Sequence, residues 1–167
     1  MWQREGRIEL YRLAAEVIAE LRVRGLTLAT GESSVGGLIG HLLTEVPGSS
    51  RVYVGGAVLY HNRLKEAIGV TSQTLERHGA VSRETAEEMA TATRRWAGTD
   101  IGLAETGIAG PKGVSEERPA GLFFIAVASA DGVVSERLML DGDRSENKLG
   151  CAESALRLLL RYVKGDG

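Results

Sequence analysis

The stretch LTLATGESSVGGLIGHLL, residues 26–43, decides the fold class of this chain. Residues 26–30 are short and apolar, as in a buried strand, and residues 38–43 carry the apolar side chains of a helix. The glycine-rich residues 31–37 join the two segments. A strand that enters a helix through such a turn is the building unit of α/β proteins, so the stretch predicts a sheet covered by helices.

Helices and strands alternate on both sides of this stretch. Apolar spacing and turn residues predict helices at residues 6–24, 62–68 (capped by Asn62), 71–78, 83–97 and 144–163, and strands at residues 52–60, 100–106, 121–129 and 133–140. Asp131-Gly132 between the last two strands is typical of a hairpin turn. We therefore predict an α/β fold, a three-layer α/β/α sandwich with a mixed, mostly parallel sheet. It forms a single domain over residues 1–167, with residues 1–7 and 164–167 as flexible ends.

Composition excludes several classes of function. The chain has 167 residues, of which 43% are hydrophobic, and its net charge of −2 comes without a basic run, so no nucleic-acid partner is predicted. Cys151 is the single cysteine and the three histidines lack ligand spacing, which predicts no disulfide and no metal. Apolar runs stay well short of the ~18 residues of a membrane span, so we expect a cytoplasmic protein with no membrane contact.

Three polar, glycine-containing segments follow predicted strands: residues 31–37, 60–65 and 106–113. Ligands of open α/β sheets bind at the carboxyl ends of the strands. We therefore expect these three segments to meet at one edge of the sheet and to form the site.

The first segment places Ser33 and Ser34 at the start of a predicted helix. Main-chain N–H groups at such a position can bind a phosphate or the oxyanion of an acyl-transfer intermediate. Ser33 is then a candidate nucleophile; the alternative is that either serine is only a helix cap. Neither the Walker pattern nor the Gly-x-Ser-x-Gly elbow is present in this segment.

The second segment contains Tyr60 and Lys65. A serine hydroxyl needs a base to attack an amide, and a lysine serves if partial desolvation lowers its pKa. Tyr60 can relay a proton or orient the lysine. The alternatives are a solvated Lys65 and a Tyr60 that only packs in the core.

The third segment, residues 106–111, consists mostly of small residues that let the main chain approach a ligand. Lys112 follows it, and Arg144 opens the last predicted helix after an acidic cap. Both are candidates for a phosphate contact. The alternatives are a wide turn and an exposed first-turn arginine.

The run Thr30-Gly-Glu-Ser-Ser-Val-Gly-Gly37 resembles the Thr-Ala-Glu-Ser-Cys-Thr-Gly-Gly motif of the CinA C-terminal domain family, the nicotinamide mononucleotide deamidases. The resemblance extends from residue 8 to residue 163. Further matching motifs follow in the same order at residues 47–50, 55–56, 60–65, 69–70, 78–82, 106–111, 119–121 and 142–144.

This resemblance implies an amidohydrolase that converts nicotinamide mononucleotide to nicotinic acid mononucleotide and ammonia without a metal or cofactor. It implies Ser33 as the nucleophile, Lys65 as the base and Tyr60 as the motif tyrosine, and it makes a homo-oligomer plausible. Loop chemistry adds a set of expected substrate-binding residues: Ser34, Gly36, Gly37, Thr106, Gly107, Ile108, Ala109, Gly110 and Arg144. Longer family members carry an N-terminal domain associated with pyrophosphatase activity; this chain has no room for it, so that activity is not expected.

Several residues depart from the family pattern. Ser34, Val35 and Gly31 replace Cys, Thr and Ala, and Glu105 stands where a small or apolar residue is usual. A Glu105 side chain that points into the pocket would repel a phosphate. Two other functions therefore stay open: a nucleotide-binding module that has lost turnover, and an amidase for a different small amide.

Overall fold

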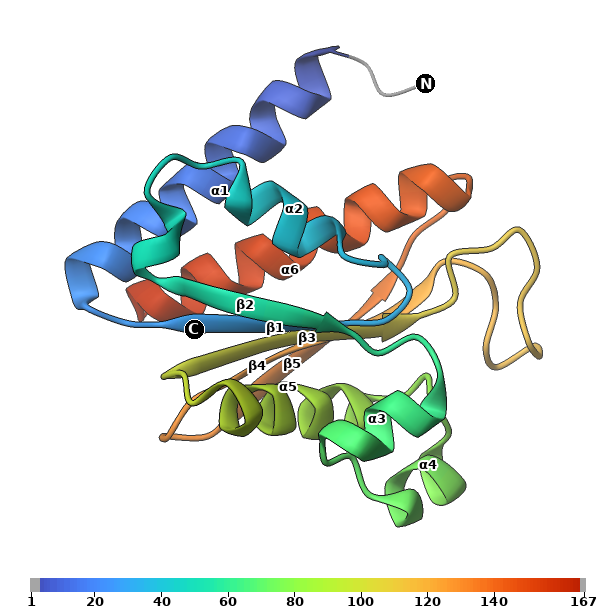
Figure 1. Cartoon of the computed structure of the whole chain (residues 1–167). Helices are drawn as coiled ribbons and strands as arrows, with labels where there is room; N and C mark the ends of the chain where they lie inside the picture. Colours follow the sequence, from blue (N-terminus) through green and yellow to red (C-terminus); the bar gives the residue numbers. More distant parts are fainter. Residues whose placement is uncertain (1–3, 166–167) are drawn as a thin grey trace.

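The computed structural model describes residues 4–165 and has a sheet with helices on both faces (Figure 1). The predicted three-layer α/β/α sandwich is confirmed. The strands are β1 (Leu28–Glu32), β2 (Tyr53–Val58), β3 (Ile101–Gly107), β4 (Leu122–Ala128) and β5 (Val133–Met139). The helices are α1 (Arg4–Arg24), α2 (Leu38–Thr44), the 3-10 turn η1 (Ser49–Arg51), α3 (Asn62–Ile68), α4 (Ser72–His78), α5 (Arg83–Ala97) and α6 (Arg144–Lys164).

The five-stranded sheet has the order β2-β1-β3-β4-β5. β1 pairs in parallel with both β2 and β3, whereas the β3–β4 and β4–β5 pairs are antiparallel. Four strands thus run in one direction and β4 runs opposite to them, so the sheet is mixed. The prediction of a mostly parallel sheet holds for the strand directions, whereas two of the four strand pairs are parallel and two are antiparallel. The predicted hairpin joins β4 to β5.

Two apolar layers cover the sheet. Above it in Figure 1, α1, α2 and α6 form the larger core, which includes Leu21, Leu42 and Leu156. Below it, α5 packs with α3 and α4 on a smaller core around Met89 and Ala126. Burial of apolar surface on both faces supplies the main stabilisation of such a sandwich.

Local capping explains where the long helices begin. Ser82 accepts a hydrogen bond from the N–H of Thr85 at the start of α5. Asp143 and Glu146 form a reciprocal capping box at the start of α6. The prediction that Asn62 caps α3 is wrong, because the His61 side chain accepts from the N–H of Arg63 instead.

The first strand lies two residues later than predicted, so Gly31 and Glu32 belong to β1. A Cβ at residue 31 would stand 2.3 Å from Thr93 Oγ1, which shows that Gly31 lets α5 pack closely on the strand. Gly31 therefore permits this close contact between the strand and α5.

Both ends of the described chain are helical. The predicted flexible ends included residues 1–3 and 166–167, which lie outside the described residues, but α1 already begins at Arg4 and α6 continues to Lys164. None of the helices within residues 4–165 is both long enough and apolar enough to cross a membrane.

Candidate functional site

The chain leaves β1 through α2 to reach β2 on one side, and later returns through α3–α5 to β3 on the other side. This reversal makes the carboxyl end of β1 a topological switch point, where α/β sheets open a crevice for ligands. A pocket of about 230 Å³ lies there. Its lining comes from all three predicted segments, from the residues before α5 and from the start of α6: Ser33, Ser34, Tyr60, Lys65, Ala80, Val81, Thr106, Gly107, Ile108, Ala109, Gly110, Lys112 and Arg144.

Ser33 and Lys65 meet in this pocket. Lys65 Nζ donates a hydrogen bond to Ser33 Oγ at 3.0 Å. The same Nζ donates to the carbonyl oxygens of Leu59 at 2.7 Å and Tyr60 at 3.5 Å. These two carbonyls, from the connection between β2 and α3, hold Nζ within hydrogen-bond distance of the serine hydroxyl.

The environment of Lys65 shifts its pKa below that of a solvated lysine. The side chain is only 1% exposed, so the alternative of a solvated surface lysine is wrong. Burial lowers the pKa of Lys65, and the carboxylate of Glu105 partly opposes this by favouring the charged form. A lysine with a lowered pKa can take a proton from a serine hydroxyl.

The prediction that Ser33 stands at the start of a helix is wrong. Ser33 lies in the turn directly after β1, and α2 begins only at Leu38, with Gly37 as its N-cap. Gly37 has a φ of 96° and provides no side-chain cap, so the cap alternative for Ser33 and Ser34 is also wrong. The nucleophile candidate therefore sits on a strand-to-turn corner.

A buried carboxylate from the neighbouring strand holds this turn. Glu105 Oε1 accepts from the N–H of Ser33 at 2.5 Å and from that of Val35 at 3.0 Å, and Oε2 accepts from Ser34 Oγ at 2.5 Å. The Glu105 side chain is 0% exposed and does not line the pocket. Burial raises the pKa of Glu105, while these three hydrogen bonds favour its ionised form.

A second buried carboxylate fixes the helix that follows. Glu32 accepts from the N–H groups of Ile39 at 3.0 Å and Gly40 at 2.7 Å, which are among the unpaired donors of the first turn of α2. Burial raises the pKa of Glu32, and the N–H groups oppose that shift. Neighbouring strands thus provide one carboxylate for the turn and one for the helix.

The glycine-rich segment after β3 forms the opposite wall. Thr106 Oγ1 donates to the carbonyl of Ala80 at 2.7 Å, and Arg144 Nη1 donates to the carbonyl of Gly110 at 2.6 Å. Asn147 Nδ2, which the sequence did not single out, donates to the carbonyl of Ala109 at 3.0 Å. The wall is therefore tied to α6 by two side chains.

The remaining predicted residues take different places. Tyr60 lines the pocket, but its side chain is 64% exposed, so the alternative of a core residue is wrong; its contact with Lys65 is through the main chain. Gly36 and Gly37 lie outside the lining. A Cβ on Gly36 would stand 3.6 Å from Lys148 Nζ, which places that cation beside the turn.

Sequence reasoning missed several contributors. Ala80 and Val81 line the pocket from the segment before α5, and Asn147 and Glu32 act from buried positions. The motif at residues 78–82 was the available signal for the first two. Asn147 was missed because one of its partners, the carbonyl of Ala109, lies 38 residues earlier in the chain. Its other partner is Gly142, directly before the N-cap of α6.

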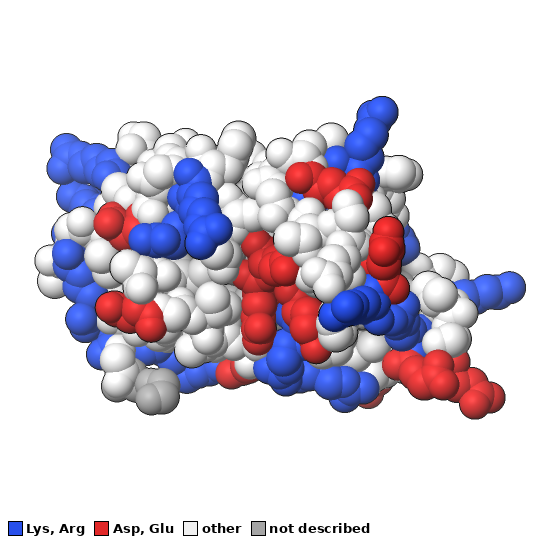
Figure 2. Space-filling view, turned by 90° about the horizontal axis from the view of Figure 1, so that it is seen from below, with Lys and Arg blue, Asp and Glu red and all other residues white. Residues whose placement is uncertain are grey.

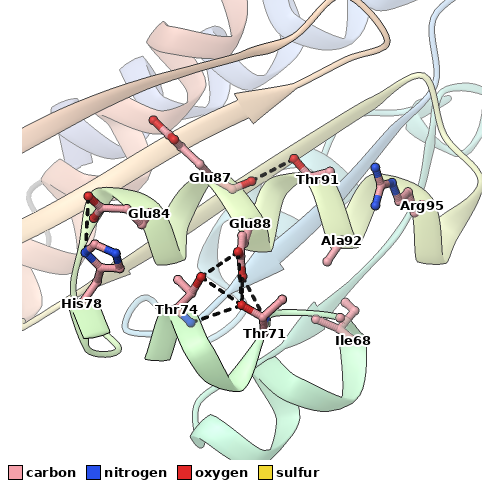
Figure 3. A pocket seen from close by; sticks show the side chains of 11 residues that line it. Ile68, Thr71, Thr74, His78, Glu84, Glu87, Glu88, Thr91, Ala92 and Arg95 are labelled. Carbon is pink, nitrogen blue, oxygen red and sulfur yellow. Dashed lines mark hydrogen bonds and ion pairs between the residues drawn. The ribbon is translucent and has the colours of Figure 1, made fainter. Parts of the chain in front are cut away.

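A larger pocket of about 480 Å³ lies between α4 and α5 (Figure 3). Seen from below, carboxylates gather along the middle of this face (Figure 2). Of the carboxylates that line the pocket, Glu88 accepts from Thr71 and Thr74 at the start of α4, and Glu84 pairs with His78 at 3.5 Å. None of the predicted site residues within the described chain lines this pocket.

The fold and the site define a class of protein: three-layer α/β/α domains with a serine–lysine pair at the switch point of the sheet. Residues 10–163 match the model of the CinA C-terminal domain. The chain belongs to this family, as the sequence motifs predicted.

Named relatives and solved structures agree with this assignment. The chain is 48% identical over 153 residues to a CinA-like protein of Myxococcus xanthus and 43% identical over 150 residues to a putative competence-damage inducible protein of Desulforudis audaxviator. These matches cover 90% and 89% of this chain but 36% of each relative, so the chain spans little more than a third of their length.

Solved structures match over nearly their whole length. The competence/damage inducible protein CihA of Agrobacterium tumefaciens superposes with a TM-score of 0.86 at 39% identity, over 90% of this chain and 93% of that one. A competence or damage-inducible protein of Enterobacter asburiae gives 0.89 at 30% identity, over 92% and 98%.

Proposed function

We propose that the chain is an amidohydrolase that uses Ser33 as nucleophile and Lys65 as base, and that its substrate is nicotinamide mononucleotide. The observation that carries the proposal is the 3.0 Å hydrogen bond between Lys65 Nζ and Ser33 Oγ in a pocket at the switch point. The family resemblance supports the proposed substrate, and the serine–lysine pair supports the proposed acyl-transfer chemistry.

The reaction balances with these two residues and water. Neutral Lys65 takes the proton of Ser33 as Oγ attacks the carboxamide carbon, and the resulting ammonium gives that proton to the amide nitrogen, which leaves as ammonia when its bond to the carbon breaks. Water then attacks the acyl-serine; Lys65 accepts its proton and returns one to Ser33 Oγ. The products are the carboxylic acid and ammonia.

The oxyanion of the tetrahedral intermediate needs N–H donors near Ser33. The sequence suggested residues 34–37 and 106–108 for this role. Val35 N–H is engaged by Glu105, Gly37 N–H by Glu32 and Ile108 N–H by the carbonyl of Leu122 at 2.8 Å. Gly36 lies outside the pocket lining, so in the turn after β1 the proposed donor is narrowed to the N–H group of Ser34.

Cations at the pocket wall support an anionic substrate. Lys112 and Arg144 line the pocket, and Lys148 Nζ lies beside Gly36. Arg144 and Lys148 are four residues apart on α6 and so share a face of that helix. A phosphate placed between α6 and the turn would meet two or three positive charges.

The departures that suggested a binding module without turnover lie outside the pocket. Val35 is 1% exposed within the larger core, and the Glu105 carboxylate is bound by the turn, so neither side chain contacts a ligand in the pocket. We therefore favour the amidohydrolase.

The test is ammonia release from nicotinamide mononucleotide, with nicotinic acid mononucleotide measured in parallel. We expect S33A to lose turnover and S72A to keep it, because Ser72 is an exposed residue of α4 outside the pocket. Equal rates in the wild type and S33A would refute the nucleophile. If another amide is hydrolysed faster than the mononucleotide, the proposed amide hydrolysis stands but the proposed substrate is wrong.

A further inference from the structure

Glu105 has an unusual set of partners for a buried acid. Its carboxylate takes two main-chain N–H groups and one hydroxyl, all from three consecutive residues, and one of them is the N–H of the proposed nucleophile. An ionised carboxylate is acceptor-only, which suits the N–H groups of Ser33 and Val35, both of which donate to Glu105.

The Glu105 side chain approaches the turn from the face of the sheet that α2 and α6 cover. Glu105 lies two residues beyond Leu103 on β3, so both point to the face covered by α2 and α6, where Leu103 belongs to the larger core. Glu105 thus reaches Ser33 from the buried side, whereas Lys65 reaches Ser33 Oγ on the pocket side. The serine is held between an acid on its main chain and a base on its side chain.

We propose that Glu105 is a positioning residue that fixes Ser33 Oγ opposite Lys65 by holding the main chain of residues 33–35. This inference rests on the proposed function for its kinetic consequence. Its structural part, the hold on the turn, stands on the three hydrogen bonds alone.

Three variants separate the hold from the charge and from packing. In E105Q, the amide oxygen can still accept from the N–H groups of Ser33 and Val35, and the amide nitrogen can donate to Ser34 Oγ, so the hold survives without the charge. E105A removes all acceptors. E105M also removes them but fills the space, and it replaces E105A if the latter does not fold.

We expect kcat of E105A and E105M to fall about tenfold to a hundredfold, the effect of a misplaced nucleophile, with KM within about threefold of wild type. E105Q should restore kcat to within a few-fold. L156A serves as the control, because Leu156 is a buried core residue of α6 and its truncation weakens the fold without touching the pocket.

Hydrogen exchange of the amides of Ser33 and Val35 gives a readout that does not need turnover. Faster exchange in E105A or E105M, with protection regained in E105Q, supports the hold. Unchanged exchange overturns it, even if wild type releases no ammonia and the proposed function itself has failed. An intact kcat, a loss confined to KM, or an equal loss in L156A overturns the positioning role.

Discussion

Replacement of Lys65 by methionine separates catalysis from stability. Methionine matches the length of the buried stem but has no proton to donate or accept, so Ser33 loses its base and turnover should fall by at least about 10²–10⁴-fold. The carbonyl of Leu59 loses its 2.7 Å partner, which costs about 1–3 kcal/mol. Removal of a polar amine that is buried away from water offsets this cost. We therefore expect an inactive protein that remains folded.

The pH dependence of stability provides a second signature. Because burial lowers the pKa of Lys65 in the folded state, the unfolded chain binds the proton more tightly. This destabilisation is full below the folded pKa and disappears as the pH rises to the value of an unfolded lysine, about 10.4. Wild-type stability relative to K65M should therefore increase with pH across that window.

Ammonia release and urea unfolding of both proteins at several pH values between 7 and 10 test these expectations. Turnover in K65M within a few-fold of wild type would show that Lys65 is not the base. A stability difference that stays flat or decreases with rising pH would refute the assignment of a lowered pKa.

Three more perturbations follow from the structure. R144M should raise KM for the mononucleotide about tenfold or more, the value of one charge-assisted contact, and should leave KM for nicotinamide riboside, which lacks the phosphate, unaffected; equal effects on both would exclude a phosphate contact. N147A breaks the links from Asn147 to Ala109 and Gly142 and should lower the free energy of unfolding by about 1–3 kcal/mol in urea titrations, so an unchanged midpoint would contradict the tie. The hydroxyl and N–H of Thr27 lower the pKa of Asp100, so wild type should exceed D100N in Tm at neutral pH and lose this advantage as the pH falls through the lowered pKa; a constant difference would refute it.

Local signals predicted most of the fold. The range 83–97 matches α5 and the range 62–68 matches α3, because apolar spacing and flanking turn residues mark both helices. The hairpin turn at Asp131-Gly132 also lies where its sequence indicates. The convergence of three loops on one pocket followed from strand direction alone.

Long-range contacts account for what the sequence did not predict. Glu32 belongs to β1 despite its charge, because the first turn of α2 satisfies its carboxylate. Ser33 lies in a turn and not at the predicted helix start for a similar reason, because Glu105, 72 residues later in the chain, holds that turn. A local pattern carries no signal for partners at that separation.

Glu32 and Glu105 hold the segment after β1 largely through the N–H groups of residues 33, 35, 39 and 40. Every amino acid except proline supplies that group. Val35 illustrates the result, since its apolar side chain takes no part in the contact and its N–H donates to Glu105. The side chains at these four positions can therefore change during evolution without loss of the contacts to Glu32 and Glu105. Proline is the one substitution that these contacts exclude.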